Sequence, residues 1–294
     1  MDIEPTRSCR YAIMSPVRNE EMNVEQTVKS VLSQTELPLA WVIVNDSSTD
    51  RTVEIINKMT AEIPWITLIS KKRSDFAIER GPGIVESFYI GFNSLDLKAV
   101  DYVVKLDCDV EFNADFFERI FKKFKERPRL GICSGLGFER QGSRTVKMRV
   151  SDNSAFGATR VYRRQCFEEI GGLEHAWGWD GIDEIRADML GWEVRTFDDI
   201  PFLHLKPHAA KNKFEHGVSA YIKGSHPLYV VVRGLLRMRD RPYIISGLAL
   251  IWGFFSSYFK NIRKIDDVDF RKHVRKKEFA RLSDHVAWWK QRPF

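Results

Sequence analysis

Two aspartates separated by one residue, Asp107 and Asp109, directly follow an apolar run at residues 102–106 that is typical of a buried strand. Because the chain turns where a strand ends, both carboxylates can approach one divalent cation or a ribose. Mg²⁺ and Mn²⁺ bind carboxylate oxygens together with phosphate oxygens of a substrate. An Asp-X-Asp sequence alone is also common in surface turns, but its place after a strand favours a metal or nucleotide site.

Polar clusters also follow two other predicted strands. Residues 15–20 come after the strand at 11–14, and Asn45-Asp46 comes after the strand at 41–44. In parallel α/β sheets, ligands bind beyond the carboxyl ends of the strands. We therefore expect the three clusters to converge at one edge of a sheet.

The first hundred residues alternate short β-rich runs with helical spacings, which indicates βαβ units and a parallel sheet with helices on both faces. Helices are predicted at residues 20–34, 52–59 and 84–95, and a third strand at 65–69. After residue 110 the pattern is mixed. A helix is predicted at 115–126, a strand at 130–133, and two strands, expected to be antiparallel, at 154–162 and 192–197. The fold class is α/β, a mostly parallel Rossmann-like sheet flanked by helices.

Four stretches resemble the GT-A fold glycosyltransferases, and among them the inverting family 2. They are AIMSPVRNEE (12–21) with VKSVLSQT (28–35), VIVNDSSTDRT (42–52), LDCD (106–109), and GGL (171–173) followed by WDGIDEIRA (179–187) and LGW (190–192). They occur in the family's order and cover roughly residues 10–200. The resemblance implies the GT-A (nucleotide-diphospho-sugar transferase) fold and transfer of a sugar from a nucleotide-sugar.

The resemblance also implies roles at the nucleotide. Asp46 matches the acid that hydrogen-bonds the base, and Ser15 and Pro16 match the backbone that borders base and ribose. Asn45 replaces the first acid of the usual Asp-Asp pair, whereas the second is kept. The predicted nucleotide-sugar site further includes Arg18, Glu20, Asp107, Cys108 and Asp109.

The resemblance also implies a bound Mn²⁺ or Mg²⁺ with Asp109 as a ligand. Asp107, nearer the ribose and diphosphate, is the second predicted ligand. In related transferases a histidine after the catalytic helix approaches the metal or diphosphate. His204 is accordingly the third predicted ligand, although a structural role is equally open for it. His208 is a weaker candidate.

A catalytic base is implied about a dozen residues before the Gly191-Trp192 dipeptide. That count gives Asp180, and Arg186 falls at the place of the family's arginine. Asp180 would take the proton of an acceptor hydroxyl. Asp183 and Glu184 lie within one helical turn of it. They would either share that role or cap the N-terminus of the helix and interact with its dipole.

Composition limits the remaining choices. The four cysteines are far apart without a CxxC pair and the N-terminus is polar, so we expect free thiols, no zinc site and a cytoplasmic protein. The net charge of +6 equals that of residues 260–294, which hold 11 Lys/Arg and 5 Asp/Glu. The balanced body argues against a nucleic-acid-binding protein.

The C-terminal third suggests contact with a membrane. Residues 242–259 carry no charge over 18 positions and are flanked by basic residues, which fits either a buried helix or one lying in a membrane surface. The basic tail is either a solvated helix or a contact with anionic lipid. We expect a catalytic domain at 1–225, with a nucleotide-binding half to about 110 and an acceptor half from 111. A helical, membrane-associating extension follows at 226–294, at the inner face of the cytoplasmic membrane.

The leading hypothesis is an inverting, metal-dependent glycosyltransferase. It would move a sugar from a UDP- or GDP-sugar to a hydroxyl of a lipid-linked saccharide in surface polysaccharide or glycoconjugate synthesis. The alternative is a polyprenyl-phosphate sugar synthase, whose acceptor is the phosphate itself. A sugar nucleotidyltransferase is disfavoured because no Gly-rich loop follows the first strand, and a dehydrogenase because no GxGxxG does. A non-catalytic binding module is disfavoured by the four aspartates Asp46, Asp107, Asp109 and Asp180 together.

Overall fold

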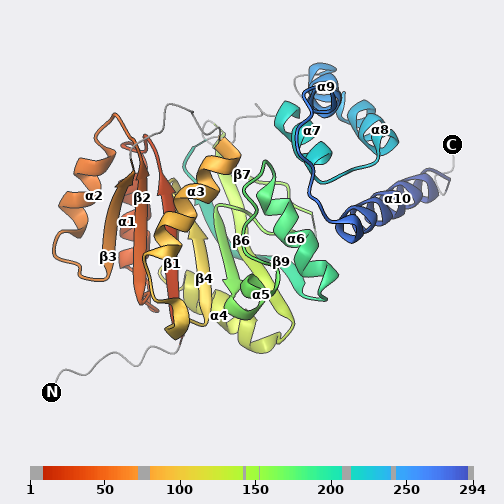
Figure 1. Cartoon of the computed structure of the whole chain (residues 1–294). Coiled ribbons are helices and arrows are strands. Elements are labelled where there is room, and N and C mark those ends of the chain that lie inside the picture. Colours follow the sequence, from red (N-terminus) through yellow and green to blue (C-terminus); the bar gives the residue numbers. More distant parts are fainter. Residues whose placement is uncertain are drawn as a thin grey trace. The chain divides into compact units, whose positions relative to one another are not determined.

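A computed structural model describes residues 9–71, 80–141, 144–151, 153–206, 213–239 and 243–290. The chain divides into two compact units. The first unit comprises residues 1–173 and 190–208, and the second comprises 174–189 and 209–294. Figure 1 follows the chain from the strands of the N-terminal half to the helices of the C-terminal third.

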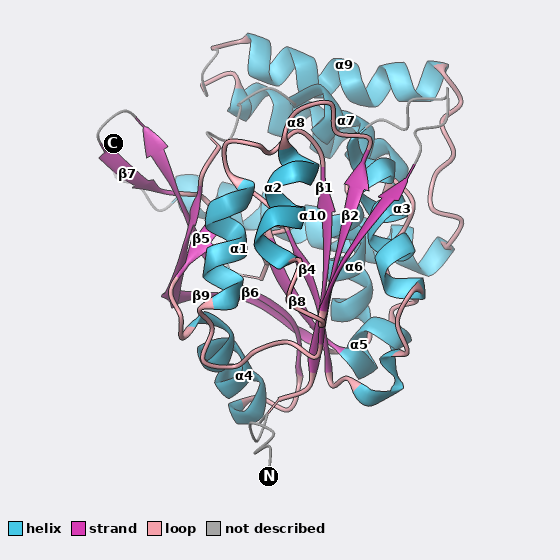
Figure 2. Cartoon of the chain, turned by 90° about the vertical axis from the view of Figure 1, so that its left-hand side faces the viewer, coloured by secondary structure: helices cyan, strands magenta, loops and turns pink. Residues whose placement is uncertain are grey.

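The N-terminal half of the first unit is a parallel sheet, as predicted. Strand β1 (Tyr11–Val17) pairs with β2 (Ala40–Asp46) and β4 (Tyr102–Leu106), and β2 also pairs with β3 (Ile66–Lys71). The intervening helices are α1 (Val24–Leu32), α2 (Thr52–Thr60) and α3 (Arg80–Asn93), with a short 3-10 helix η1 at Leu97–Ala99. In Figure 2 these strands lie side by side and point the same way.

Alternate residues of these strands serve opposite faces of the sheet. Ile13 belongs to the same core as Val28 of α1 and Ile56 of α2. On the other face, a Cβ added to Gly91 of α3 would lie 3.2 Å from Met14 Cγ. Figure 1 shows α1 and α2 on one side of the strands and α3 on the other. Helices therefore cover both faces, and the strand ends are left to hold the polar residues.

The sheet becomes mixed beyond β4. Its order is β3-β2-β1-β4-β8-β6-β9-β5, with β7 paired to β6. Strand β8 (Thr159–Arg163) is antiparallel to β4 and β6, as predicted. Strand β9 (Glu193–His204) is antiparallel to β5 (Val110–Phe112) but parallel to β6 (Leu130–Gln141), so the antiparallel prediction for it was only partly right. Beside these lie α4 (Phe116–Glu126), as predicted, α5 (Arg164–Glu169) and β7 (Arg144–Lys147).

Strand β6 is longer than its apolar run predicts, and other groups lie close to the backbone at two glycines of the added part. A Cβ at Gly135 would lie 2.4 Å from the carbonyl oxygen of Ile200, and one at Gly137 would lie 2.8 Å from Met148 Sδ. Glycine inside a strand commonly marks such a close approach. The short strands β5 and β7 carry no comparable signal and were not predicted.

The second unit consists of helices α6 (Trp179–Met189), α7 (Lys213–Ile222), α8 (Pro227–Arg237), α9 (Ile245–Phe259) and α10 (Val268–Lys290). Helices α7 and α9 cross at glycines. A Cβ at Gly217 would lie 2.1 Å from the carbonyl oxygen of Leu250, and one at Gly253 would lie 2.1 Å from that of Phe214. The two backbones are thus in direct contact.

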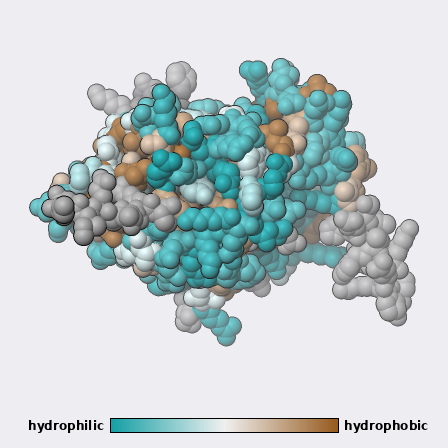
Figure 3. All heavy atoms as spheres, turned by 90° about the horizontal axis from the view of Figure 1, so that it is seen from below, coloured by the Kyte–Doolittle hydropathy of each residue, from teal (hydrophilic) through white to brown (hydrophobic). Residues whose placement is uncertain are grey.

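Helix α9 is apolar on both its buried and its exposed sides. Leu250 and Phe254 are buried, whereas Ile245, Leu248 and Trp252 are 63, 52 and 63% exposed. Among the described residues, no helix has both the length and the apolar character needed to cross a membrane. In the view of Figure 3, hydrophobic residues show only in scattered groups between hydrophilic ones.

Candidate active site

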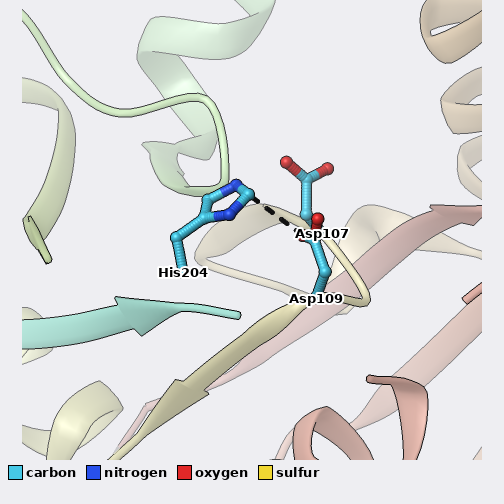
Figure 4. A group of neighbouring side chains, drawn as sticks. All are labelled: Asp107, Asp109 and His204. Atoms are coloured by element: carbon cyan, nitrogen blue, oxygen red, sulfur yellow. Dashed lines mark ion pairs between the residues drawn. The ribbon is translucent and has the colours of Figure 1, made fainter. Parts of the chain in front are cut away.

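Asp107, Asp109 and His204 meet at the carboxyl end of β4. One ligand atom from each lies within 4.8 Å of the others. The aspartates follow β4, and pairing of Val110 in β5 with His204 in β9 brings the histidine beside Asp109. Figure 4 shows the imidazole and both carboxylates turned toward a common space. The structure thus brings together the three residues predicted as metal ligands.

The hydrogen bond of His204 fixes which ring nitrogen faces the aspartates. Nδ1 lies 2.8 Å from the carbonyl oxygen of Lys206, which can only accept, so Nδ1 carries the hydrogen. In the neutral ring, Nε2 then keeps its lone pair, and it lies 3.8 Å from Asp109 Oδ1. Metal-bound histidines are commonly oriented in this way by a partner on the other nitrogen.

The electrostatics of Asp109 favour a cation. Burial, and then the negative charge of Asp107, raise the pKa of Asp109 to about 6, and His204 opposes the shift. Two close carboxylates with an imidazole suit Mn²⁺ at least as well as Mg²⁺, because imidazole is a ligand of transition metals. The donor set therefore fits the predicted ion.

Lys105 also belongs to the site, although it was not predicted from the sequence. Its buried ammonium forms an ion pair with Asp107 and donates to the carbonyl oxygen of Gly157 at 3.0 Å. The contacts hold the Asp107 carboxylate to the segment before β8. A lysine inside the apolar run at 102–106 was the available signal, since a charged side chain in a buried strand needs a partner.

Asp46 lies at the end of β2, as predicted. It lies beside Lys71, a second residue of the site that was not predicted from the sequence. Lys71 pairs with it in the register of β2 and β3, and Lys71 Nζ lies 3.2 Å from Asp46 Oδ1. The same ammonium lies 2.9 Å from Glu86 Oε2. The predicted third strand stopped at residue 69, two positions before this lysine.

The residues at the end of β1 and just after it have several structural tasks. Ser15 is buried, and its hydroxyl accepts a hydrogen bond from Trp41 Nε1 at 2.8 Å. Pro16 is half-buried and Arg18 is exposed. Glu20 forms an ion pair with Lys206, just beyond His204.

Cys108 lies between the two aspartates but belongs to the hydrophobic core. Burial raises the pKa of its thiol well above the usual range, and the charge of Asp107 adds to this. A neutral, buried thiol fits a packing role better than a contact with the nucleotide.

The three predicted catalytic acids lie on α6, in the second unit. Asp180 is exposed, Glu184 is half-buried, and Asp183 is fully buried with its Oδ1 accepting from the Glu184 amide. Of the three, Asp180 is the most accessible to a substrate. Arg186 forms an ion pair with Glu174 at 2.6 Å. His208 lies outside the described residues.

Comparison with known proteins decides the family. The sequence model of glycosyl transferase family 2 matches residues 12–177, more than half of the chain. This chain belongs to glycosyl transferase family 2. The resemblance seen in the sequence is confirmed, and the protein is a glycosyltransferase.

Related family members include polysaccharide synthases. Chondroitin synthase of Pasteurella multocida (strain Pm70) is 31% identical over 127 residues, which are 42% of this chain and 12% of that protein. Poly-beta-1,6-N-acetyl-D-glucosamine synthase of Staphylococcus epidermidis is 25% identical over 202 residues, which are 61% of this chain and 44% of that protein. The chain thus spans less than half of either relative.

Solved structures share the fold. The mannosyltransferase PcManGT from Pyrobaculum calidifontis, in complex with GDP-Man and Mn²⁺, has a TM-score of 0.55 at 15% identity and covers 99% of this chain and 84% of its own. S. aureus TarS 1–349 with UDP-GlcNAc has a TM-score of 0.54 at 13% identity, and the match covers 90% of this chain and 78% of the TarS chain. The prediction of a GT-A fold is confirmed.

Proposed function

We propose that this glycosyltransferase is inverting and metal-dependent, and that it transfers a sugar from a UDP- or GDP-sugar to an acceptor hydroxyl in one displacement. The observation that carries the proposal is the convergence of Asp107, Asp109 and His204 at the end of β4. Asp46 and Lys71 lie at the ends of the neighbouring parallel strands β2 and β3, at the same edge of the sheet. In such folds that edge is the place for a nucleotide.

Asp107, Asp109 and His204 would hold Mn²⁺ or Mg²⁺. When bound, the ion offsets the charge that develops on the diphosphate leaving group. Lys105 keeps the Asp107 carboxylate in place, and the Lys206 carbonyl orients His204. The Mn²⁺ complex of PcManGT supports this assignment.

Asp46 and Lys71 together offer one acceptor and one donor to the base. The carboxylate accepts from the imide N–H of uracil, or from N1–H and the amino group of guanine. The ammonium, 3.2 Å from that carboxylate, donates to the adjacent ring carbonyl of either base. Cytosine has an amino group and an unprotonated ring nitrogen at these positions, so CDP should be rejected.

Asp180 is proposed as the general base, with Asp183 and Glu184 as its alternates on α6. The acceptor oxygen bonds to the anomeric carbon, its proton passes to the Asp180 carboxylate, and the bond from that carbon to the diphosphate breaks. Exposure of the Asp180 side chain supports access to an acceptor. Residues 1–225 would carry this chemistry.

A saccharide acceptor, lipid-linked and used in surface polysaccharide or glycoconjugate synthesis, is proposed from the named relatives and the second unit. Large apolar side chains are exposed before, along and at the end of α9: Tyr243, Ile244, Ile245, Leu248, Trp252, Tyr258 and Phe259. Exposed basic residues flank them at Arg239, Lys260 and Arg263. Apolar anchors beside cations suit an anionic membrane surface. The proposed location is the inner face of the cytoplasmic membrane.

Transfer is tested by incubating the purified chain with a panel of UDP- and GDP-sugars, with and without Mn²⁺, and measuring release of the nucleotide diphosphate. One donor should be turned over with metal. Asp109→Ala should abolish that turnover, whereas Asp198→Asn, a surface aspartate paired with Lys147, should not. Metal-independent turnover at the same rate in Asp109→Ala would refute the proposed site.

Membrane association is tested separately by sedimentation with vesicles of phosphatidylcholine or of phosphatidylglycerol. Binding should favour the anionic vesicles and fall in the double variant Ile245→Gln/Trp252→Gln. Protein that stays in the supernatant with both vesicle types would contradict this part of the proposal.

A further inference from the structure

Lys206 contacts the candidate metal site through its backbone and the segment after β1 through its side chain. Its carbonyl oxygen accepts the hydrogen bond of His204 Nδ1 at 2.8 Å. Its ammonium forms an ion pair with Glu20 and lies 3.5 Å from the carbonyl oxygen of Asn19. One residue thus joins a proposed metal ligand to a carboxylate 186 positions earlier in the sequence.

The sheet holds the backbone up to Leu205 but not Lys206. His204 is the last residue of β9 and pairs with both neighbouring strands. The Leu205 amide donates to the carbonyl oxygen of Asp109 at 2.8 Å. Within the part of the chain that the structure describes, the polar contacts of Lys206 are those given above. The place of its carbonyl oxygen therefore depends on what holds its side chain.

Glu20 is a firmly held partner for that side chain. Its amide donates to Thr52 Oγ1 at 2.7 Å, and its carbonyl oxygen accepts from the amides of Asn23 and Val24, each at 2.9 Å. Oε1 of its carboxylate pairs with Lys206, and Oε2 accepts from Asn23 Nδ2 at 3.0 Å. The Glu20 side chain is only 13% exposed, against 45% for Lys206. A carboxylate fixed at both oxygens can keep the longer, more exposed lysine side chain in one place.

The two charges of the pair act on the metal site in opposite directions. Burial is the main cause of the raised pKa of Asp109, the charge of Glu20 raises this pKa further, and the charge of Lys206 lowers it. Loss of both charges together would therefore change the field at Asp109 less than loss of either one. What the pair adds to the site is chiefly geometric, because it holds the carbonyl oxygen that orients His204.

We propose that the Glu20–Lys206 ion pair is a positioning element of the metal site, and that it strengthens the site's preference for transition metals over Mg²⁺ by holding the His204 imidazole. The inference rests on the proposed function, in which His204 binds the metal. Imidazole is a good ligand for transition metals, whereas Mg²⁺ takes oxygen ligands. Groups that orient a histidine ligand tune metal affinity in the same way.

The test compares Co²⁺ with Mg²⁺ on the full chain, at a saturating concentration of UDP or GDP, whichever the unmodified chain binds. Co²⁺ is the probe because nitrogen-containing sites bind it more tightly than Mn²⁺. Calorimetry gives the ratio of the Co²⁺ affinity to the Mg²⁺ affinity, in which effects common to both ions cancel. This ratio should fall by about three- to tenfold in Glu20→Gln and in Lys206→Met, since the orienting carbonyl itself remains. Lys206→Arg, which keeps the cation, should keep the ratio.

An exposed ion pair on α1 supplies matched controls. Glu25 and Lys29 form that pair, and Glu25→Gln and Lys29→Met should bind both ions as the unmodified chain does. In His204→Ala the ratio should already be low, and adding Lys206→Met should lower it no further. Thermal melts establish that each variant is folded.

An unchanged ratio in both Glu20→Gln and Lys206→Met would overturn the proposal. An equal loss of affinity for the two ions would also overturn it, because the pair would then act through charge or stability alone. So would a further fall of the ratio when Lys206→Met is added to His204→Ala. Failure of the proposed function has a different signature: the unmodified chain would bind neither nucleotide with metal, or His204→Ala would leave the ratio unchanged.

Discussion

His204 Nε2 lies 3.8 Å from Asp109 Oδ1, although 94 residues separate them in the sequence. Pairing of β5 with β9 creates this proximity, and the Lys206 carbonyl holds the ring by Nδ1. The Nε2 lone pair of His204 and the carboxylates of Asp109 and Asp107 therefore face the same space. Each of the following expectations tests a part of that arrangement or of the fold that supports it.

We expect His204→Ala to lower the affinity for Mn²⁺ by more than about tenfold, since even loss of a group that only orients a ligand costs 10- to 100-fold. Mn²⁺ binding is measured by calorimetry in the presence of the preferred nucleotide. His175→Ala, which removes an exposed histidine of the second unit, is the matched control. Equal Mn²⁺ affinity in the two variants would show that His204 is structural.

Mn²⁺ binding should weaken in acid because protons compete for Asp109. Its pKa is raised to about 6, chiefly by burial, so the carboxylate is ionised and available above that pH and protonated below it. Below pH 6 the apparent affinity should fall by up to about tenfold per pH unit, the slope for displacing one proton. A flat profile between pH 5 and 7 would contradict the role of Asp109.

Asp46→Asn should weaken UDP or GDP binding by about 10- to 100-fold, because a hydrogen bond to a charged group contributes about 1.5–3 kcal/mol. Lys71→Met should act in the same direction, since it removes both the proposed donor to the base and the ammonium that pairs with Asp46. Calorimetry with the free nucleotides measures both, with Asp198→Asn as the control. If Asp46→Asn binds UDP and GDP normally, base recognition lies elsewhere.

Gly253→Ala should lower the free energy of unfolding by about 1–3 kcal/mol, the usual cost of overpacking. The added methyl group would lie 2.1 Å from the Phe214 carbonyl oxygen, so α7 and α9 must separate. Leu248→Ala on the exposed side of α9 should change stability far less. Denaturant unfolding of both variants makes the comparison, and equal stabilities would contradict the close crossing.

The strand ends were predictable because period-two and helical apolar patterns identify βαβ units, and Asp107, Asp109 and Asp46 follow strands directly. His204 was reached through the family resemblance and not through pattern. Lys71 and Lys105 were missed because their partners are set by sheet register and burial, which apolar spacing does not encode.

The central claim is that the Asp107–Asp109–His204 group binds a metal that supports nucleotide binding. Calorimetric titration of the purified chain with UDP, GDP and CDP, each with and without Mn²⁺, tests it most directly. We predict metal-dependent binding of UDP or GDP, no binding of CDP, and loss of binding in Asp109→Ala. Absence of binding to all three nucleotides by the folded chain, or equal binding by Asp109→Ala, would contradict the account.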